Sequence, residues 1–264
     1  MKKIFYLSAI ALVTFTACRK RPDDPVPVKL ESFDLVVDAY NGSKLFSPLD
    51  TLVSVTGHKF RVKSAKMYFS NINLVKTDGT KVPFKSIVLL SMDGQAVYKT
   101  AHNATSVVIK GQVPPGMYSG VEFGLGIPAA DNHKDAVAYL PTEPLSQFQK
   151  MWWNTNDGYM FAKVEGNISG DLTQPNVLNI DYNYEMGTDA QYKTLFIAQN
   201  FQVYQNAMGD INEALLKVQV DQFFYSATDT IKPEINPVAH SNVSAEAPLA
   251  NKMLQLVQKS ISAQ

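Results

Sequence analysis

Histidines are the side chains in this sequence best suited to bind a metal or move a proton. The chain has four of them, at positions 58, 102, 133 and 240. None stands two or four residues from another, so any metal site must combine distant segments. His133 and His240 are the better candidates, because His133 lies in the segment around the tryptophans and His240 precedes a helix-like C-terminal segment. For each histidine, a loop position without a ligand role is the alternative.

Recognisable catalytic motifs are missing from the sequence. There is no H-E-x-x-H, C-x-x-C or phosphate-binding loop. Residues 116–120 read GMYSG, which places Ser119 one position too late for the nucleophile of a G-x-S-x-G turn. No nucleophile stands beside a general base in an arrangement that we recognise. We therefore expect a binding protein and not an enzyme.

Both tryptophans of the chain, Trp152 and Trp153, stand next to each other in a segment that runs from Met151 to Phe161. Adjacent side chains on an extended chain point in opposite directions. We therefore expect one tryptophan in the core and the other in a cleft or at the surface.

The N-terminus resembles a bacterial export signal. Lys2 and Lys3 precede an apolar stretch over residues 4–15, and Ala17 stands before Cys18, the single cysteine of the chain. We expect a lipoprotein signal peptide over residues 1–17 and a lipidated Cys18 that anchors the chain to the bacterial envelope, at the outer membrane. A plain cleaved secretory signal is the alternative. Residues 18–29, with three prolines, predict an extended tether.

Charge argues against a nucleic-acid partner, because the 24 basic residues are balanced by 24 acidic ones without strong clustering. Beyond the export signal, no run approaches the roughly 18 apolar residues of a membrane-spanning helix. The remaining chain, residues 30–264, is long enough to bury a core of its own. We expect these residues to form one β domain.

Apolar and polar residues alternate along about ten short segments, which predicts strands with one buried face. The segments include residues 33–39, 59–62, 66–74, 118–127, 159–164, 177–184 and 194–203, and turn residues such as Asp78-Gly79 separate them. Few helices intervene, so the pattern favours an all-β fold, an antiparallel β-sandwich of immunoglobulin-like or related type. Helical spacing of apolar residues after Pro248 predicts one C-terminal helix over residues 247–260.

Several short motifs, taken in order, resemble the MbnP-like family of exported copper-binding proteins associated with methanobactin. They are residues 67–74 (MYFSNINL), 115–118 (PGMY), 121–128 (VEFGLGIP), 151–153 (MWW), 158–161 (GYMF) and 165–166 (EG). The resemblance spans most of the chain, from about Phe33 to the C-terminal helix. It implies an aromatic β domain that binds copper through histidines and an oxidised tryptophan, kynurenine. It also implies a partner, a di-haem cytochrome c peroxidase of the MauG type.

This sequence departs from the family pattern at the expected copper ligands. The family's Met-x-Trp-x-Trp reads Met151-Trp152-Trp153-Asn154-Thr155, so the second tryptophan is missing. Its Phe-His-x-Gly reads Tyr184-Glu185-Met186-Gly187, which puts a carboxylate where an imidazole is expected. Imidazole suits copper, whereas a carboxylate is a harder ligand.

The sequence is therefore consistent with two functions. In the first, the chain is a copper-binding or copper-handling lipoprotein of the cell envelope, with Trp153, Glu185 and either His133 or His240 at the metal. In the second, it is an envelope binding module without metal. The module uses an aromatic face of Trp152, Tyr159 and Tyr184 for a small molecule, a glycan or a partner protein.

Overall fold

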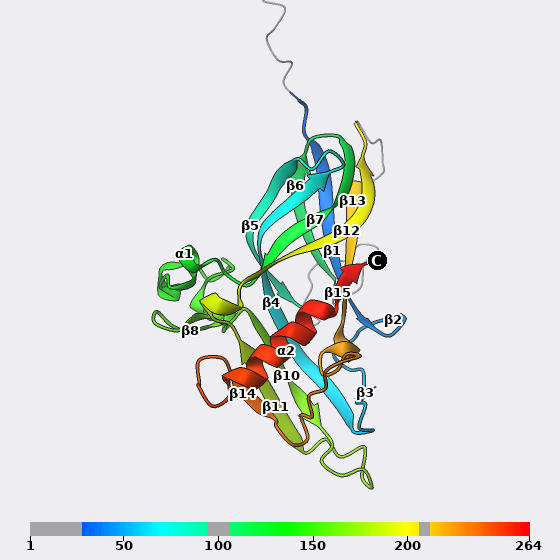
Figure 1. The fold of residues 1–264 in the computed structure, drawn as a ribbon, viewed down its shortest axis with the longest axis vertical. Helices are drawn as coiled ribbons and strands as arrows, with labels where there is room; N and C mark the ends of the chain where they lie inside the picture. Colours follow the sequence, from blue (N-terminus) through cyan, green and yellow to red (C-terminus); the bar gives the residue numbers. More distant parts are fainter. Residues whose placement is uncertain (1–27, 94–105, 206–211) are drawn as a thin grey trace, which may run out of the picture.

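The computed structural model describes residues 28–93, 106–205 and 212–264. These residues form two large β-sheets that pack face to face, a separate two-stranded sheet, and one helix that lies across the larger sheet (Figure 1). The predicted β-sandwich with a C-terminal helix is confirmed. The export signal, Cys18 and the tether predicted before residue 30 lie outside the described residues, apart from the last two tether positions.

The smaller sheet has the order β15-β13-β1-β2, and β6 also pairs with β1. Its strands are β1 Glu31–Asn41, β2 Lys44–Leu45, β6 Val107–Val113, β13 Asn212–Gln219 and β15 Ile261–Ala263. The larger sheet has the order β12-β7-β4-β10-β11-β14, and β3 and β5 also pair with β4. Its strands are β3 Leu52–Val53, β4 Lys59–Lys76, β5 Lys81–Ser91, β7 Gly116–Leu125, β10 Ala162–Ile168, β11 Ile180–Met186, β12 Lys193–Val203 and β14 Val238–His240.

Strand pairing differs from the sequence prediction in two respects. The two segments predicted at residues 59–62 and 66–74 form one long strand, β4, which pairs with β10 at its beginning and with β5 and β7 further along. Two pairings are parallel, β1 with β13 and β11 with β14. Parallel neighbours come from segments far apart in the chain, so local alternation carries no signal for them.

The C-terminal helix α2 runs from Ala247 to Lys259, within one residue of its prediction. Pro248 lies in its first turn, where the absent N–H has no helical partner to lose. The apolar face of α2 packs on β11 and β14 and covers that end of the larger sheet (Figure 1). Its buried side chains are Ala250, Met253, Leu254, Leu256 and Val257.

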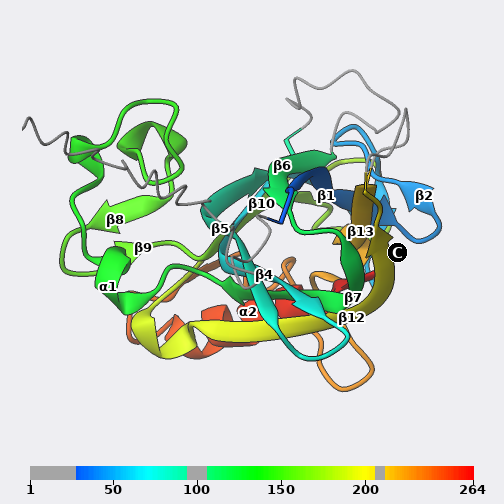
Figure 2. The ribbon, with the colours of Figure 1, turned by 90° about the horizontal axis from the view of Figure 1, so that it is seen from above.

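Beside the sandwich lies a lobe that contains the tryptophan segment (Figure 2). The lobe consists of residues 127–161 and includes the helix α1 Ala129–Asn132 and the hairpin of β8 Trp152–Asn154 and β9 Gly158–Tyr159. It has a buried apolar cluster of its own, separate from the main core, that includes Tyr68, Met151, Tyr159 and Phe161. Trp152 and Trp153 are both half-buried against this cluster.

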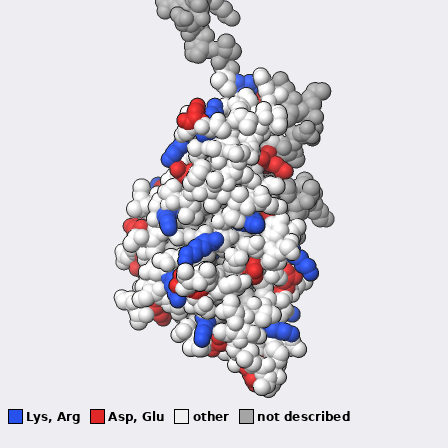
Figure 3. Space-filling model, turned by 45° about the vertical axis from the view of Figure 1, so that its right-hand side comes forward, with Lys and Arg blue, Asp and Glu red and all other residues white. Residues whose placement is uncertain are grey.

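Four short 3-10 helices complete the described elements: Ala136–Ala138, Gln147–Gln149, Asp189–Gln191 and Val220–Gln222. Within the residues that the structure describes, no helix is both long and apolar enough to cross a membrane. Basic and acidic side chains are interspersed over the face that Figure 3 presents.

Candidate functional site

Three strands of the larger sheet bring Lys163, Glu185 and His240 into one row. Lys163 on β10 lies opposite Glu185 on β11, and Glu185 lies opposite His240 on β14. Residues directly opposite each other on neighbouring strands point to the same face of the sheet. The neighbouring positions Tyr184 and Met186 are buried in the core, so these three side chains lie on the opposite face. We call Lys163, Glu185 and His240 the cross-strand row.

Glu185 is the central residue of the row, and its carboxylate accepts two hydrogen bonds and forms an ion pair. The Trp153 indole Nε1 donates to Glu185 Oε2 at 2.8 Å, and Asn183 Nδ2 donates to Oε1 at 3.1 Å. Lys163 Nζ lies 3.3 Å from Oε1, and only 12% of the Glu185 side chain is exposed. Burial by itself raises the pKa of this carboxyl, but the hydrogen bonds from Trp153 and Asn183 and the Lys163 charge outweigh it and hold the pKa below its ordinary value.

His240 is oriented by a second carboxylate. Its Nδ1 lies 2.7 Å from Glu246 Oε2, which also accepts the backbone N–H of His240 at 2.9 Å. When the imidazole is neutral, a carboxylate on Nδ1 favours the tautomer with the proton on that nitrogen and leaves the lone pair on Nε2. Nε2 is 3.8 Å from Glu185 Oε2. Two electron-rich atoms therefore face the same small gap.

His133 lies elsewhere, in the lobe. Its Nε2 is 3.0 Å from Asp189 Oδ2, and its Nδ1 is 3.0 Å from the Thr155 carbonyl oxygen. These hydrogen bonds, the one to Asp189 first, raise the pKa of His133. His133 has no hydrogen bond or ion pair with any member of the cross-strand row. Of the two candidate histidines, the structure brings only His240 to Trp153 and Glu185.

The proposed aromatic face does not form. Tyr159 is buried in the lobe cluster and donates its hydroxyl to the Leu145 carbonyl at 2.8 Å. Tyr184 is buried in the main core and donates its hydroxyl to the Asn236 carbonyl. Burial raises the pKa of both phenols. Of the three residues, only Trp152 is half-buried, and its Nε1 is enclosed without a hydrogen-bond partner among the described residues. The expectation failed because Tyr184 occupies an inward position of β11, in line with buried Tyr182 and Met186.

Lys163 and Glu246 are site residues that the sequence did not single out. Lys163 stands at an outward position of β10, where the burial pattern alternates regularly. Glu246 stands six residues after His240, just before α2. Both are unremarkable as charged surface residues in sequence, since only the pairing of β10, β11 and β14 makes them neighbours of Glu185 and His240.

The donor set limits what the site could hold. Within the described parts of the chain, no group of three or more His, Cys, Asp or Glu residues is arranged to hold a metal ion. The cross-strand row offers two donors, His240 Nε2 and a Glu185 oxygen, and the adjacent Lys163 ammonium repels a cation. An intact Trp153 indole donates a hydrogen bond and supplies no ligand. The residues thus match a copper site only in part.

Comparison with known proteins identifies the family. A family model described as MbnP matches residues 30–243. The structure is similar to that of MbnP from Methylosinus trichosporium, with a TM-score of 0.52 and 16% sequence identity over 81% of each chain. At this low sequence identity, the structural similarity is evidence for a shared fold alone. No curated protein matches the chain. The match to the family model covers most of the sequence, and the chain therefore belongs to the MbnP family.

Proposed function

We propose that this MbnP-family protein is a copper-binding lipoprotein of the bacterial envelope, and that it acts by binding and not by catalysis. Copper would be held by His240 Nε2 and the Glu185 carboxylate, beside Trp153. The observation that carries the proposal is the orientation of His240. Glu246 holds Nδ1, so that Nε2 faces the Glu185 carboxylate across 3.8 Å. In metal sites, the second ring N–H of a histidine ligand ordinarily donates a hydrogen bond to a carboxylate in this way.

The spacing of these two donors suits a bridging metal cation. Metal–ligand bonds of about 2 Å allow two ligand atoms on one ion to stand up to about 4 Å apart. An imidazole nitrogen and a carboxylate oxygen favour Cu(II) over the softer Cu(I). Water would complete the coordination, because two protein ligands leave several positions open. We expect such a site to bind copper less tightly than one with several imidazoles.

Trp153 would complete the site if it were oxidised. Kynurenine has a carbonyl and an aniline nitrogen as additional donors, and the indole nitrogen of Trp153 lies 2.8 Å from a Glu185 oxygen. We propose a di-haem peroxidase partner as the source of this oxidation. Peptide mass mapping of residues 151–163 from native cells tests this part of the proposal independently of copper.

Titration with Cu(II), followed by calorimetry, tests the copper site. We expect stoichiometric binding to the wild-type protein and an affinity at least about tenfold weaker in His240→Ala, since loss of even an outer-shell partner has an effect of that size. His133→Ala is the matched control. It removes another histidine that pairs with a carboxylate, outside the cross-strand row, and should leave the affinity unchanged. Equal losses in both variants, or no binding by the wild type, would contradict the proposal.

A second function, an envelope binding module without metal, is favoured by one observation. Lys163 Nζ already balances the charge of Glu185 at 3.3 Å, so the carboxylate needs no metal. Lys163→Met separates the two functions. If copper binds here, removal of the competing cation should strengthen binding about tenfold or more, because like charges repel strongly in a partly buried site. If the site is metal-free, the variant gains no copper binding.

Lipidation at Cys18 is part of the proposal, since a single cysteine ends the apolar export signal. We expect the wild-type protein to fractionate with membranes and the Cys18→Ser variant to remain in the aqueous fraction. Each acyl CH2 group buried in the bilayer strengthens membrane binding by about 0.8 kcal/mol. Intact-mass measurement of the membrane-extracted protein checks the modification directly. An unmodified N-terminus, or cleavage at another residue, would exclude this anchor.

A further inference from the structure

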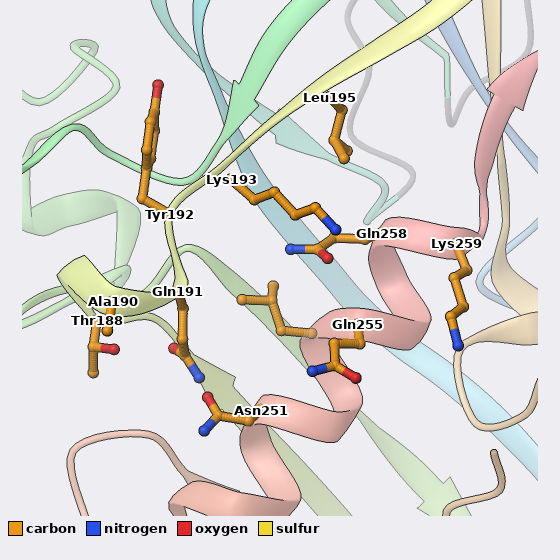
Figure 4. Close-up of a pocket in the computed structure, with 11 residues that line it drawn as sticks. Thr188, Ala190, Gln191, Tyr192, Lys193, Leu195, Asn251, Gln255, Gln258 and Lys259 are labelled. Atoms are coloured by element: carbon orange, nitrogen blue, oxygen red, sulfur yellow. The ribbon is translucent and has the colours of Figure 1, made fainter.

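A groove separates the helix α2 from the edge strand β12, away from the cross-strand row. Its volume is about 600 Å³, within the range of ligand pockets. Leu195 and Leu254 contribute its apolar surface, and the 3-10 helix Asp189–Gln191 contributes residues at one end. Figure 4 shows the groove between the two elements, with Lys193 directed toward Gln258 and Gln191 toward Asn251.

One wall of the groove is a strand edge without a partner. β12 is the terminal strand of the larger sheet, and residues 193–198 pair with β7 alone among the described strands. An edge strand leaves the N–H and C=O groups of alternate residues unpaired, which makes it a template for another chain. From Gln199 onward β12 contacts the smaller sheet, since Gln199 Nε2 donates to the Leu215 carbonyl at 3.1 Å. The open edge is therefore confined to the groove.

The polar lining of the groove carries positive charge and uncommitted amides. The Lys193 ammonium has no ion pair or hydrogen bond with another described residue, whereas the Lys259 ammonium lies 3.2 Å from Asp229 Oδ2. Among the residues that the structure describes, no acidic residue lines the groove. Three amide side chains of α2 project along it, and none makes a side-chain hydrogen bond with the described residues; they belong to Asn251, Gln255 and Gln258.

We propose that this groove binds an extended acidic peptide segment of a partner protein, which adds to β12 as a further strand. A groove between an edge strand and a helix is a known mode of peptide recognition, in which main-chain hydrogen bonds give affinity and alternate side chains give specificity. The unpaired edge at residues 193–198 supplies the main-chain groups. The free Lys193 selects a carboxylate, because complementary charge steers binding and sets the register.

The spacing along β12 defines the ligand further. Lys193 and Leu195 stand two residues apart and both line the groove, so they point to the same side of the strand. A peptide strand that pairs with β12 presents its own side chains with the same period. The best ligand thus carries an acidic residue and an apolar residue two positions apart, the first opposite Lys193 and the second against Leu195 and Leu254.

Fluorescence anisotropy with a labelled peptide, Thr-Asp-Thr-Leu-Thr-Thr, tests the groove on the full-length protein. Lys193→Glu should weaken binding at least about tenfold and should favour a peptide with Lys in place of Asp. Lys44→Glu is the matched control, because Lys44 is also an exposed lysine and lies on another strand, β2. N-methylation of alternate peptide nitrogens should abolish binding in one of the two alternating sets only, as strand addition requires.

Amide chemical shifts locate the peptide. Residues 193–198 and the exposed side of α2 should shift on titration, while the cross-strand row should not. No binding at millimolar peptide, equal weakening in Lys193→Glu and Lys44→Glu, or shifts confined to other elements would each overturn the proposal. The result is independent of copper, because the peptide titration is made in the presence of a chelator.

Discussion

Glu185→Ala is expected to lower the free energy of unfolding by about 3 kcal/mol, measured by urea denaturation. The variant leaves the Trp153 and Asn183 donors without their acceptor and removes a partner from Lys163, whose side chain is only 15% exposed. Each unsatisfied buried polar group costs about 1–3 kcal/mol, and removal of one member of a buried ion pair costs more than a surface pair.

Glu165→Ala is the control for this effect. Glu165 lies 3.0 Å from the same lysine, but 39% of its side chain is exposed. Exposed ion pairs contribute at most about 1 kcal/mol, so this variant should unfold nearly like the wild type. If the two variants lose similar amounts of unfolding free energy, the interactions of Glu185 contribute no more to stability than those of an exposed carboxylate.

The contribution of the Glu185 carboxylate to the stability of the folded protein should be lost in acid. Its pKa in the folded protein is lowered from an ordinary value of 4.5. A lowered folded pKa stabilises the protein above the unfolded pKa, and this stabilisation is lost as the pH falls through the folded pKa. The stability difference between wild type and Glu185→Gln should therefore be constant near neutral pH and shrink below about pH 4.5. A difference that persists undiminished into strong acid would contradict this assignment.

Gly187→Ala is expected to destabilise the protein by about 3 kcal/mol or more, because two backbone segments meet at this residue. A Cβ at position 187 would lie 2.4 Å from the Phe161 backbone nitrogen and 2.6 Å from the Tyr159 backbone carbonyl oxygen. Gly187 N–H donates to Ser241 Oγ at 3.1 Å, and Phe161 N–H donates to the carbonyl of Met186, the preceding residue. Alanine forces the end of β11 away from the lobe and breaks these contacts.

Gly79→Ala separates crowding from backbone strain. Gly79 has φ +85°, a left-handed conformation, but a Cβ there would meet nothing within 4 Å. Only the strain of about 1–2 kcal/mol applies. Thermal denaturation of both variants should thus give a clearly larger loss for Gly187→Ala. If the two variants melt alike, the lobe is free to move away from β11, and the geometry of the cross-strand row does not depend on that contact.

The sequence by itself determined the local elements of this protein. Alternation along residues 159–164 and 177–184 predicted two strands, because a strand with one buried face repeats every two residues. These predictions overlap β10 and β11, which the structure places at Ala162–Ile168 and Ile180–Met186. The apolar spacing after Pro248 located α2 within one residue, because a helix on a core repeats every 3.6 residues. The family motifs predicted Trp153 and Glu185 near one site, and in the structure an indole–carboxylate hydrogen bond joins these two side chains.

Only the tertiary structure decided which partners complete that site. His133 and His240 are equivalent in sequence, yet the parallel pairing of β11 with β14 brings only His240 opposite Glu185. The register of β10 adds Lys163, and the turn before α2 adds Glu246. Strand pairing between distant segments depends on how the whole core packs, whereas periodicity reports only whether each residue is buried.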